Sequence, residues 1–106
     1  MTIRFHADFA LDLDHITHQL ALTRPGWDKR FDDAVKRIVQ NLKENPRLYQ
    51  RIDDVIPGEY RRAPLSGFPH VVIYALTGDE ITVLTVLDPA RRPLAWLDRT
   101  PSHDEP

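Results

Sequence analysis

The stretch HVVIYAL, residues 70–76, and the stretch ITVLTVL, residues 81–87, decide the fold class. Both are rich in β-branched and aromatic residues, which favour strands, and both are apolar at nearly every position. The turn Thr77-Gly78-Asp79 between them predicts an antiparallel hairpin. Strands this apolar are typical of the centre of a sheet, where both faces are covered, so we expect this hairpin to lie in the core.

Two further strands are expected outside this hairpin. Residues 60–65 predict a strand directly upstream of it, and Pro64 within that strand indicates an edge position or a bulge. Residues 2–6 alternate between apolar and polar side chains and predict a short first strand. Residues 47–58 are polar and show no clear period, so no element is predicted there. The sequence therefore ends with three consecutive strands.

Two amphipathic helices are expected between the first strand and these three. Asp8 is a candidate N-cap of the first helix, and the break Arg24-Pro25-Gly26 ends it. Asn45-Pro46 ends the second helix, because the residue before a proline resists helical geometry. Helices segregated from hairpin-connected strands predict an α+β domain, with the N-terminal strand followed by a two-helix hairpin packed on an antiparallel-rich sheet. The apolar stripes consist of Phe9, Leu13, Ile16 and Leu20 in the first helix, and of Trp27, Phe31, Ala34, Val35, Ile38, Val39 and Leu42 in the second.

The composition narrows the class of protein. A chain of 106 residues that is 42% hydrophobic predicts one globular domain, which we assign to residues 1–99, followed by a flexible acidic tail at 100–106. The chain has no cysteine, which excludes disulfides and thiolate sites. Neither a signal peptide nor a run of ~20 apolar residues is recognisable, so a cytoplasmic protein without membrane contact is expected. The net charge of -2 argues against the strong basic field of most nucleic-acid-binding domains.

Two longer stretches carry a resemblance to a known family. They are YRRAPLSGFPHVVIY, residues 60–74, and ITVLTVLDPARRP, residues 81–93, the second followed by Trp96 and Arg99. In this order and spacing they resemble the RelE/ParE toxins of type II toxin–antitoxin systems, and they look closer to the ParE-like, plasmid-stabilisation branch. In many relatives of that branch the last strand ends in histidine where this chain has Asp88, so no role is carried over to that position.

The resemblance implies a toxin that inhibits a macromolecular target and is neutralised by a cognate antitoxin. ParE-like members of the family poison DNA gyrase, whereas RelE-like members cut messenger RNA on the ribosome. We favour the ParE-like interpretation, in which the chain binds a protein and needs no cofactor. The alternatives that remain are a RelE-like, metal-independent endoribonuclease and a non-toxic, degenerate relative. Self-association of the free toxin is also expected, through apolar surface that the antitoxin normally covers.

The arginines are the main candidates for binding the target or the antitoxin. Arg61 and Arg62 are neighbours on one strand, so their side chains should point to opposite faces of the sheet. We expect at least one of them to contact the antitoxin or the target. In the alternative interpretation, it is an edge-strand arginine that blocks aggregation or pairs within the chain with Glu59 or Asp79.

Further binding candidates lie near the C-terminus. Arg91 and Arg92 occupy a turn between two prolines, and Arg99 follows the last apolar segment. The alternative for the Arg91–Arg92 turn is a solvated surface with only weak ion pairs. Trp96 either packs the C-terminal segment against the sheet or stands in the partner-binding face.

Catalysis would need an acid or base and cations for the phosphorane charge. For an endoribonuclease the candidates are Arg61, Arg62, His70 and Arg91, with His70 as the acid or base because histidine titrates near neutrality. Packing is the alternative role of His70, and core packing is the expected role of Tyr74. 

A metal site is not predicted. His15 and His18 are spaced i and i+3 on the polar side of the first helix, but a third ligand is missing, so we interpret them as part of a solvated face.

Overall fold

The computed structural model describes residues 2–52, 57–90 and 96–99. The expected acidic tail at 100–106 lies outside these residues. Among the described residues, no helix has both the length and the apolar character that crossing a membrane requires. The elements, in chain order, are β1 (Thr2–Phe5), α1 (Phe9–Thr23), α2 (Trp27–Glu44), β2 (Gln50–Ile52), β3 (Glu59–Pro64), β4 (Val71–Thr77), β5 (Glu80–Leu87) and the 3-10 turn η1 (Leu97–Arg99).

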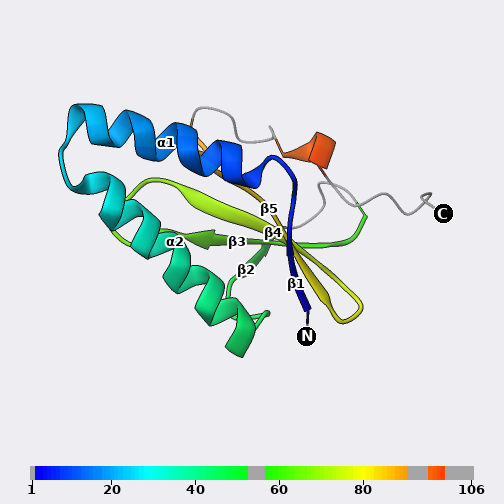
Figure 1. The fold of residues 1–106 in the computed structure, drawn as a ribbon. Coiled ribbons are helices and arrows are strands. Elements are labelled where there is room, and N and C mark those ends of the chain that lie inside the picture. Colours follow the sequence, from blue (N-terminus) through cyan, green and yellow to red (C-terminus); the bar gives the residue numbers. More distant parts are fainter. Residues whose placement is uncertain (1, 53–56, 91–95, 100–106) are drawn as a thin grey trace.

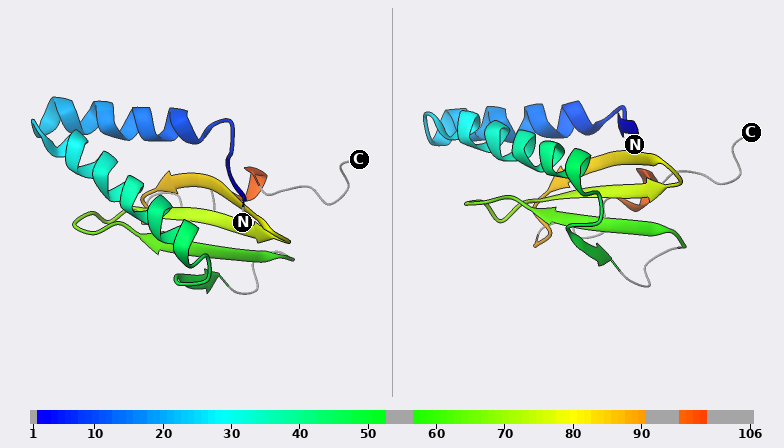
Figure 2. Two further views of the ribbon diagram at one scale, coloured as in Figure 1. Left: turned by 60° about the horizontal axis from the view of Figure 1, so that its bottom comes forward. Right: turned by 90° about the horizontal axis from the view of Figure 1, so that it is seen from below.

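The strands form one five-stranded sheet in the order β1-β5-β4-β3-β2. β1 pairs with β5 in parallel, and the other three pairings are antiparallel. The two helices form a hairpin on one face of this sheet, as the ribbon views show (Figures 1 and 2). The predicted α+β architecture, its helix hairpin and its three consecutive C-terminal strands are confirmed.

The hairpin of β4 and β5 occupies the middle of the sheet, as the sequence predicted. Every β4 residue from Val71 to Leu76 is buried. Its register with β5 shifts once, because Ile73 faces Thr85 whereas Tyr74 faces Val83, which leaves Leu84 as the extra residue of a β-bulge. The bulge matters for the site described below, because it sets the direction of the residues that follow it.

β2 was not foreseen from the sequence. It has only three residues, two of which are exposed, so it carries no alternation of apolar and polar side chains that would reveal a strand. It covers β3 only from Tyr60 to Arg62. Pro64 therefore lies where β3 has no outer neighbour, which agrees with the edge position predicted from a residue that cannot donate to a ladder.

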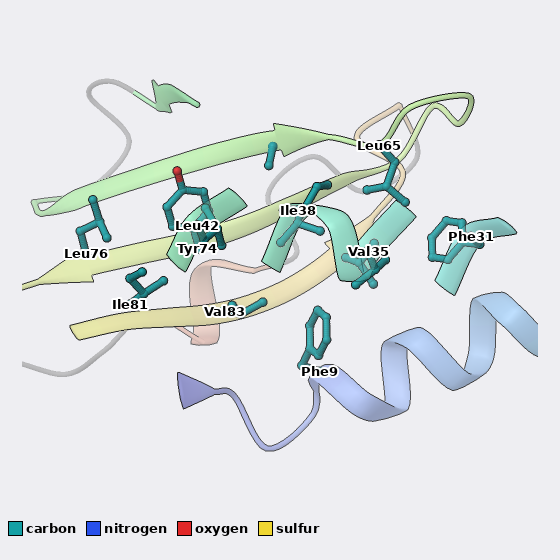
Figure 3. Packing of buried hydrophobic residues seen from close by; sticks show 13 residues of the cluster. Phe9, Phe31, Val35, Ile38, Leu42, Leu65, Tyr74, Leu76, Ile81 and Val83 are labelled. Carbon is teal, nitrogen blue, oxygen red and sulfur yellow. The ribbon is translucent and has the colours of Figure 1, made fainter. Parts of the chain in front are cut away.

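α2 supplies most of the helical side of the core. Phe31, Val35, Ile38 and Leu42 recur at spacings of four, three and four residues and are all buried. They pack against the face of the sheet that presents Tyr74 and other side chains of β4 and β5 (Figure 3). The opposite face of the sheet has its own apolar cluster, which consists of Tyr60, Val71, Ile73, Ala75, Leu84 and Trp96.

α1 is held more loosely than α2, and only Phe9 of its residues is buried. Asp8 is the N-cap residue of α1 by position, as predicted, but its side chain makes no capping hydrogen bond. Instead, the Asp8 backbone N–H donates to Nδ1 of His6 over 3.1 Å. Asp8 has helical backbone angles, φ -92° and ψ 0°, whereas an N-cap side chain acts from an extended backbone.

Candidate functional site

Arg61 lies on the face of the sheet that the helices cover, and its guanidinium binds groups of the same chain. Its Nη2 lies 2.8 Å from Oε2 of Glu59, and its Nη1 donates to the carbonyl oxygen of Tyr49 over 2.7 Å. Its side chain is only 15% exposed. Of the two roles considered for Arg61, the structure therefore places it in the intrachain pair with Glu59, where it ties β3 to the segment that leaves α2.

Glu59 is the centre of this polar cluster. Arg47 approaches the same carboxylate, with Nε 3.2 Å from Oε2. Partial burial alone would raise the pKa of Glu59, but the hydrogen bonds from Arg61 and Arg47 outweigh it and hold the pKa below its ordinary value. The carboxylate is thus ionised at neutral pH and matched by two guanidinium groups.

Tyr74 closes the cluster from β4. Its ring is fully buried, which confirms the predicted core role, and its hydroxyl donates to the carbonyl oxygen of Pro46 over 2.8 Å. Burial raises the pKa of Tyr74 to about 12. The hydroxyl therefore remains protonated and acts as a structural donor.

Arg62 points to the opposite face, as the alternation along a strand requires. It is exposed, and its guanidinium has no hydrogen bond or ion pair with another residue of the described part of the chain. Of the arginine pair on β3, Arg62 is the member that is available to an external partner.

Arg99 forms the second intrachain pair. Its guanidinium binds the Asp12 carboxylate through two nitrogens. Nη1 pairs with Oδ2, and Nη2 donates to Oδ1 over 3.2 Å. Thr85 donates from Oγ1 to Oδ2 of Asp12 over 2.7 Å, and Nη1 of Arg99 also donates to the carbonyl oxygen of Leu84. The cluster of Asp12, Thr85 and Arg99 thus joins α1, β5 and η1 directly after the β-bulge.

The sequence did not single out Asp12 or Thr85. Two signals for them were present: Thr85 is a polar residue inside the apolar run of β5, and Asp12 flanks the apolar stripe of α1. Neither signal reveals that the two residues meet, because their hydrogen bond joins positions 73 residues apart in the sequence.

A groove of about 680 Å³ lies beside this cluster, between α1 and the end of β5. Asp12, Arg99 and His70 contribute polar groups to its lining, and Leu20 and Leu87 contribute apolar ones. His70 packs edge-on against Phe31, with ring centroids 5.0 Å apart, and also against Phe68. The packing role considered for His70 is therefore present in the structure, and its ring also borders the groove.

Trp96 takes the packing role of the two that the sequence left open. It is 1% exposed, and its ring lies against Tyr60 with centroids 5.2 Å apart. The packing role considered for Trp96 is therefore present in the structure, where the indole contributes buried apolar area.

The remaining candidates can be placed only in part. Arg91 and Arg92 lie outside the described residues. His15 and His18 border a shallow hollow with Asp14 and Asp28, but no group of three or more possible ligands for a metal occurs among the residues that the structure describes. 

The comparisons with known proteins agree with this architecture. The family model described as "ParE toxin of type II toxin-antitoxin system, parDE" matches residues 3–93. Among solved structures, the chain is similar to one titled "Chromosomal ParDE TA system from P. aeruginosa", with a TM-score of 0.68 and 21% identity over 81% of this chain and 92% of that chain. No curated protein matches. Because the family model spans most of the chain and the two-helix, five-strand fold matches as well, the chain belongs to the ParE toxin family of type II toxin–antitoxin systems.

Proposed function

We propose that this chain is a toxin that acts by binding a protein target in the cytoplasm and is neutralised by a cognate antitoxin. The observation that carries the proposal is which of the candidate arginines pair within the chain and which is exposed, among those that the structure describes. Arg61 and Arg99 pair with Glu59 and Asp12 inside the chain, whereas Arg62 is exposed on the sheet face opposite the helices. One available arginine on a sheet face suits recognition of an acidic partner surface.

DNA gyrase is the target that we propose, in keeping with the ParE-like resemblance of residues 60–74 and 81–93. The net charge of -2 supports a protein target over an RNA, since binding to RNA depends on a basic field around the protein. The packing of His70 against Phe31 and Phe68 also favours binding over acid–base catalysis.

The test uses the purified full-length chain in two assays side by side. We expect inhibition of gyrase supercoiling and no ribosome-dependent cleavage of messenger RNA. Arg62→Ala should weaken the inhibition at least about tenfold, the loss expected when an arginine hot spot is truncated. Arg37→Ala is the matched control, because it removes an exposed arginine from the outer side of α2 and should leave the inhibition unchanged.

Two outcomes would replace the proposal. Cut messenger RNA together with unaffected gyrase would assign the chain to the RelE-like endonucleases. Normal growth of cells that express the chain without the protein encoded by the neighbouring gene would indicate the non-toxic relative. If toxicity is present, co-expression of that neighbouring protein should restore growth, and failure to do so would contradict the proposed neutralisation.

A further inference from the structure

α1 carries a second stripe on the side opposite its core-facing stripe, and His15 of this stripe also borders the groove beside β5. Leu11, His15, His18 and Leu22 are all exposed, and the two leucines retain 65% and 72% of their accessible surface. An α-helix turns by about 100° per residue, so the centre of this outer stripe lies roughly 160° around the helix axis from the centre of the stripe that faces the core. In the ribbon views, no other described helix or strand lies over the outer side of α1 (Figures 1 and 2). Large exposed leucines at both ends of one narrow line indicate a contact surface.

The spacing of the outer stripe is symmetric. Its residues follow at intervals of four, three and four, in the order Leu, His, His, Leu, so the stripe reads the same in both directions along the helix. These intervals are those of a coiled-coil seam. Two copies of α1 placed antiparallel would therefore set Leu11 against Leu22 of the second copy, and His15 against His18 of the second copy. A twofold interface requires this kind of self-complementary patch.

The charges at the ends of α1 fit the same arrangement. Asp8 directly precedes the helix and Arg24 directly follows it, and both are exposed. An antiparallel pair brings Asp8 of each copy to the end where Arg24 of the other lies, and it also opposes the two helix dipoles favourably. A parallel pair would instead bring like charges together at both ends. The symmetric spacing permits the antiparallel orientation, and the charges favour it over the parallel one.

We propose that the outer stripe of α1 is the dimer interface of the free chain, formed by two antiparallel copies with the four imidazoles at the twofold axis. Neutral imidazole has one donor and one acceptor nitrogen, so each pair of facing histidines can share one N–H···N hydrogen bond across the axis. One pair of short helices buries less area than a standard interface, and a Kd on the order of 10–100 µM is expected.

The test measures the Kd of the dimer by sedimentation velocity on the full-length chain near pH 7.5. Leu11→Glu and Leu22→Lys, each alone, should raise the Kd at least about tenfold, because each sets a charge against an apolar side chain. Combined in one chain, the two changes place opposite charges against each other across the axis and should restore a Kd close to that of the original chain. Neither change should unfold α1, since an acidic residue early and a basic residue late in a helix suit its dipole.

Leu48→Glu is the matched control. Leu48 is also a large exposed leucine, with 56% of its surface accessible, but it lies after α2 and off the outer stripe. It should leave the Kd unchanged. A chain that stays monomeric throughout the concentration range would overturn the proposal, as would a dimer that Leu11→Glu does not weaken. Failure of the double variant to recover would equally reject the antiparallel register.

Discussion

α1 and α2 lie side by side on the same sheet, yet they are attached to it in different ways. α2 buries four large apolar side chains and has a polar outer side, whereas α1 buries only Phe9 completely. α1 is fixed instead by a polar clip, the pairing of Asp12 with Arg99 and Thr85. α2 therefore supplies most of the helical side of the core, whereas α1 buries less of its surface and keeps two large leucines exposed on its outer stripe.

The largest effect should come from truncating the buried stripe of α2. Phe31→Ala removes a ring that is 0% exposed, and the unfolding free energy should fall by about 3–5 kcal/mol. Leu22→Ala on the outer stripe of α1 is the comparison and should change it by less than about 0.5 kcal/mol. Urea denaturation followed by circular dichroism measures both. Equal losses from the two changes would remove the contrast between the helices.

Breaking the polar clip of α1 should have an intermediate effect. Asp12→Asn and Arg99→Gln should each reduce the unfolding free energy by about 2 kcal/mol, because a charge-assisted pair that is mostly shielded from solvent loses its partner. The double variant should cost less than the sum of the two, since the second change removes a group that is already unpaired. Additive losses in this double-mutant cycle would show that the pair does not act as a unit.

The tie at the exit of α2 should be weaker than the clip of α1. Tyr74→Phe keeps the ring in the core and removes only the hydroxyl that donates to the carbonyl oxygen of Pro46. The unfolding free energy should fall by about 1 kcal/mol, the usual net contribution of one hydrogen bond. Hydrogen exchange should show the loss near Pro46 and not in α1. Faster exchange throughout α1 would contradict a separate attachment of the two helices.

The smallest effect concerns the pH dependence of the Glu59 cluster. Because the pKa of Glu59 is lowered in the folded chain, its contribution to stability is present above the unfolded pKa of about 4.3 and is lost as the pH falls through the folded pKa. Glu59→Gln should therefore lower the unfolding free energy by about 0.5 kcal/mol at pH 7 and reduce its decline below about pH 4.5. Denaturation midpoints of both chains between neutral and acidic pH measure this. Parallel profiles would contradict it.

Much of the fold could be predicted from the sequence because it depends on local periodicity. Each of the signals lies within a short segment of the sequence. They are the apolar runs of β4 and β5, the stripe of α2 and the breaks at Pro25 and Pro46. β2 escaped prediction, since a three-residue exposed strand is defined only by its partner β3. The role of Trp96 also stayed open, because burial depends on what lies opposite it in space.

The same distinction between local sequence and tertiary structure applies to the candidate site. The sequence by itself determined that Arg61 and Arg62 would point to opposite faces, because alternation along a strand is a local property. Only the tertiary structure decided that Arg61 meets Glu59 and the exit of α2, and that Arg99 closes on Asp12. The physical reason is that an ion pair forms between side chains close in space, and chain folding brings together residues whose separation along the sequence carries no signal.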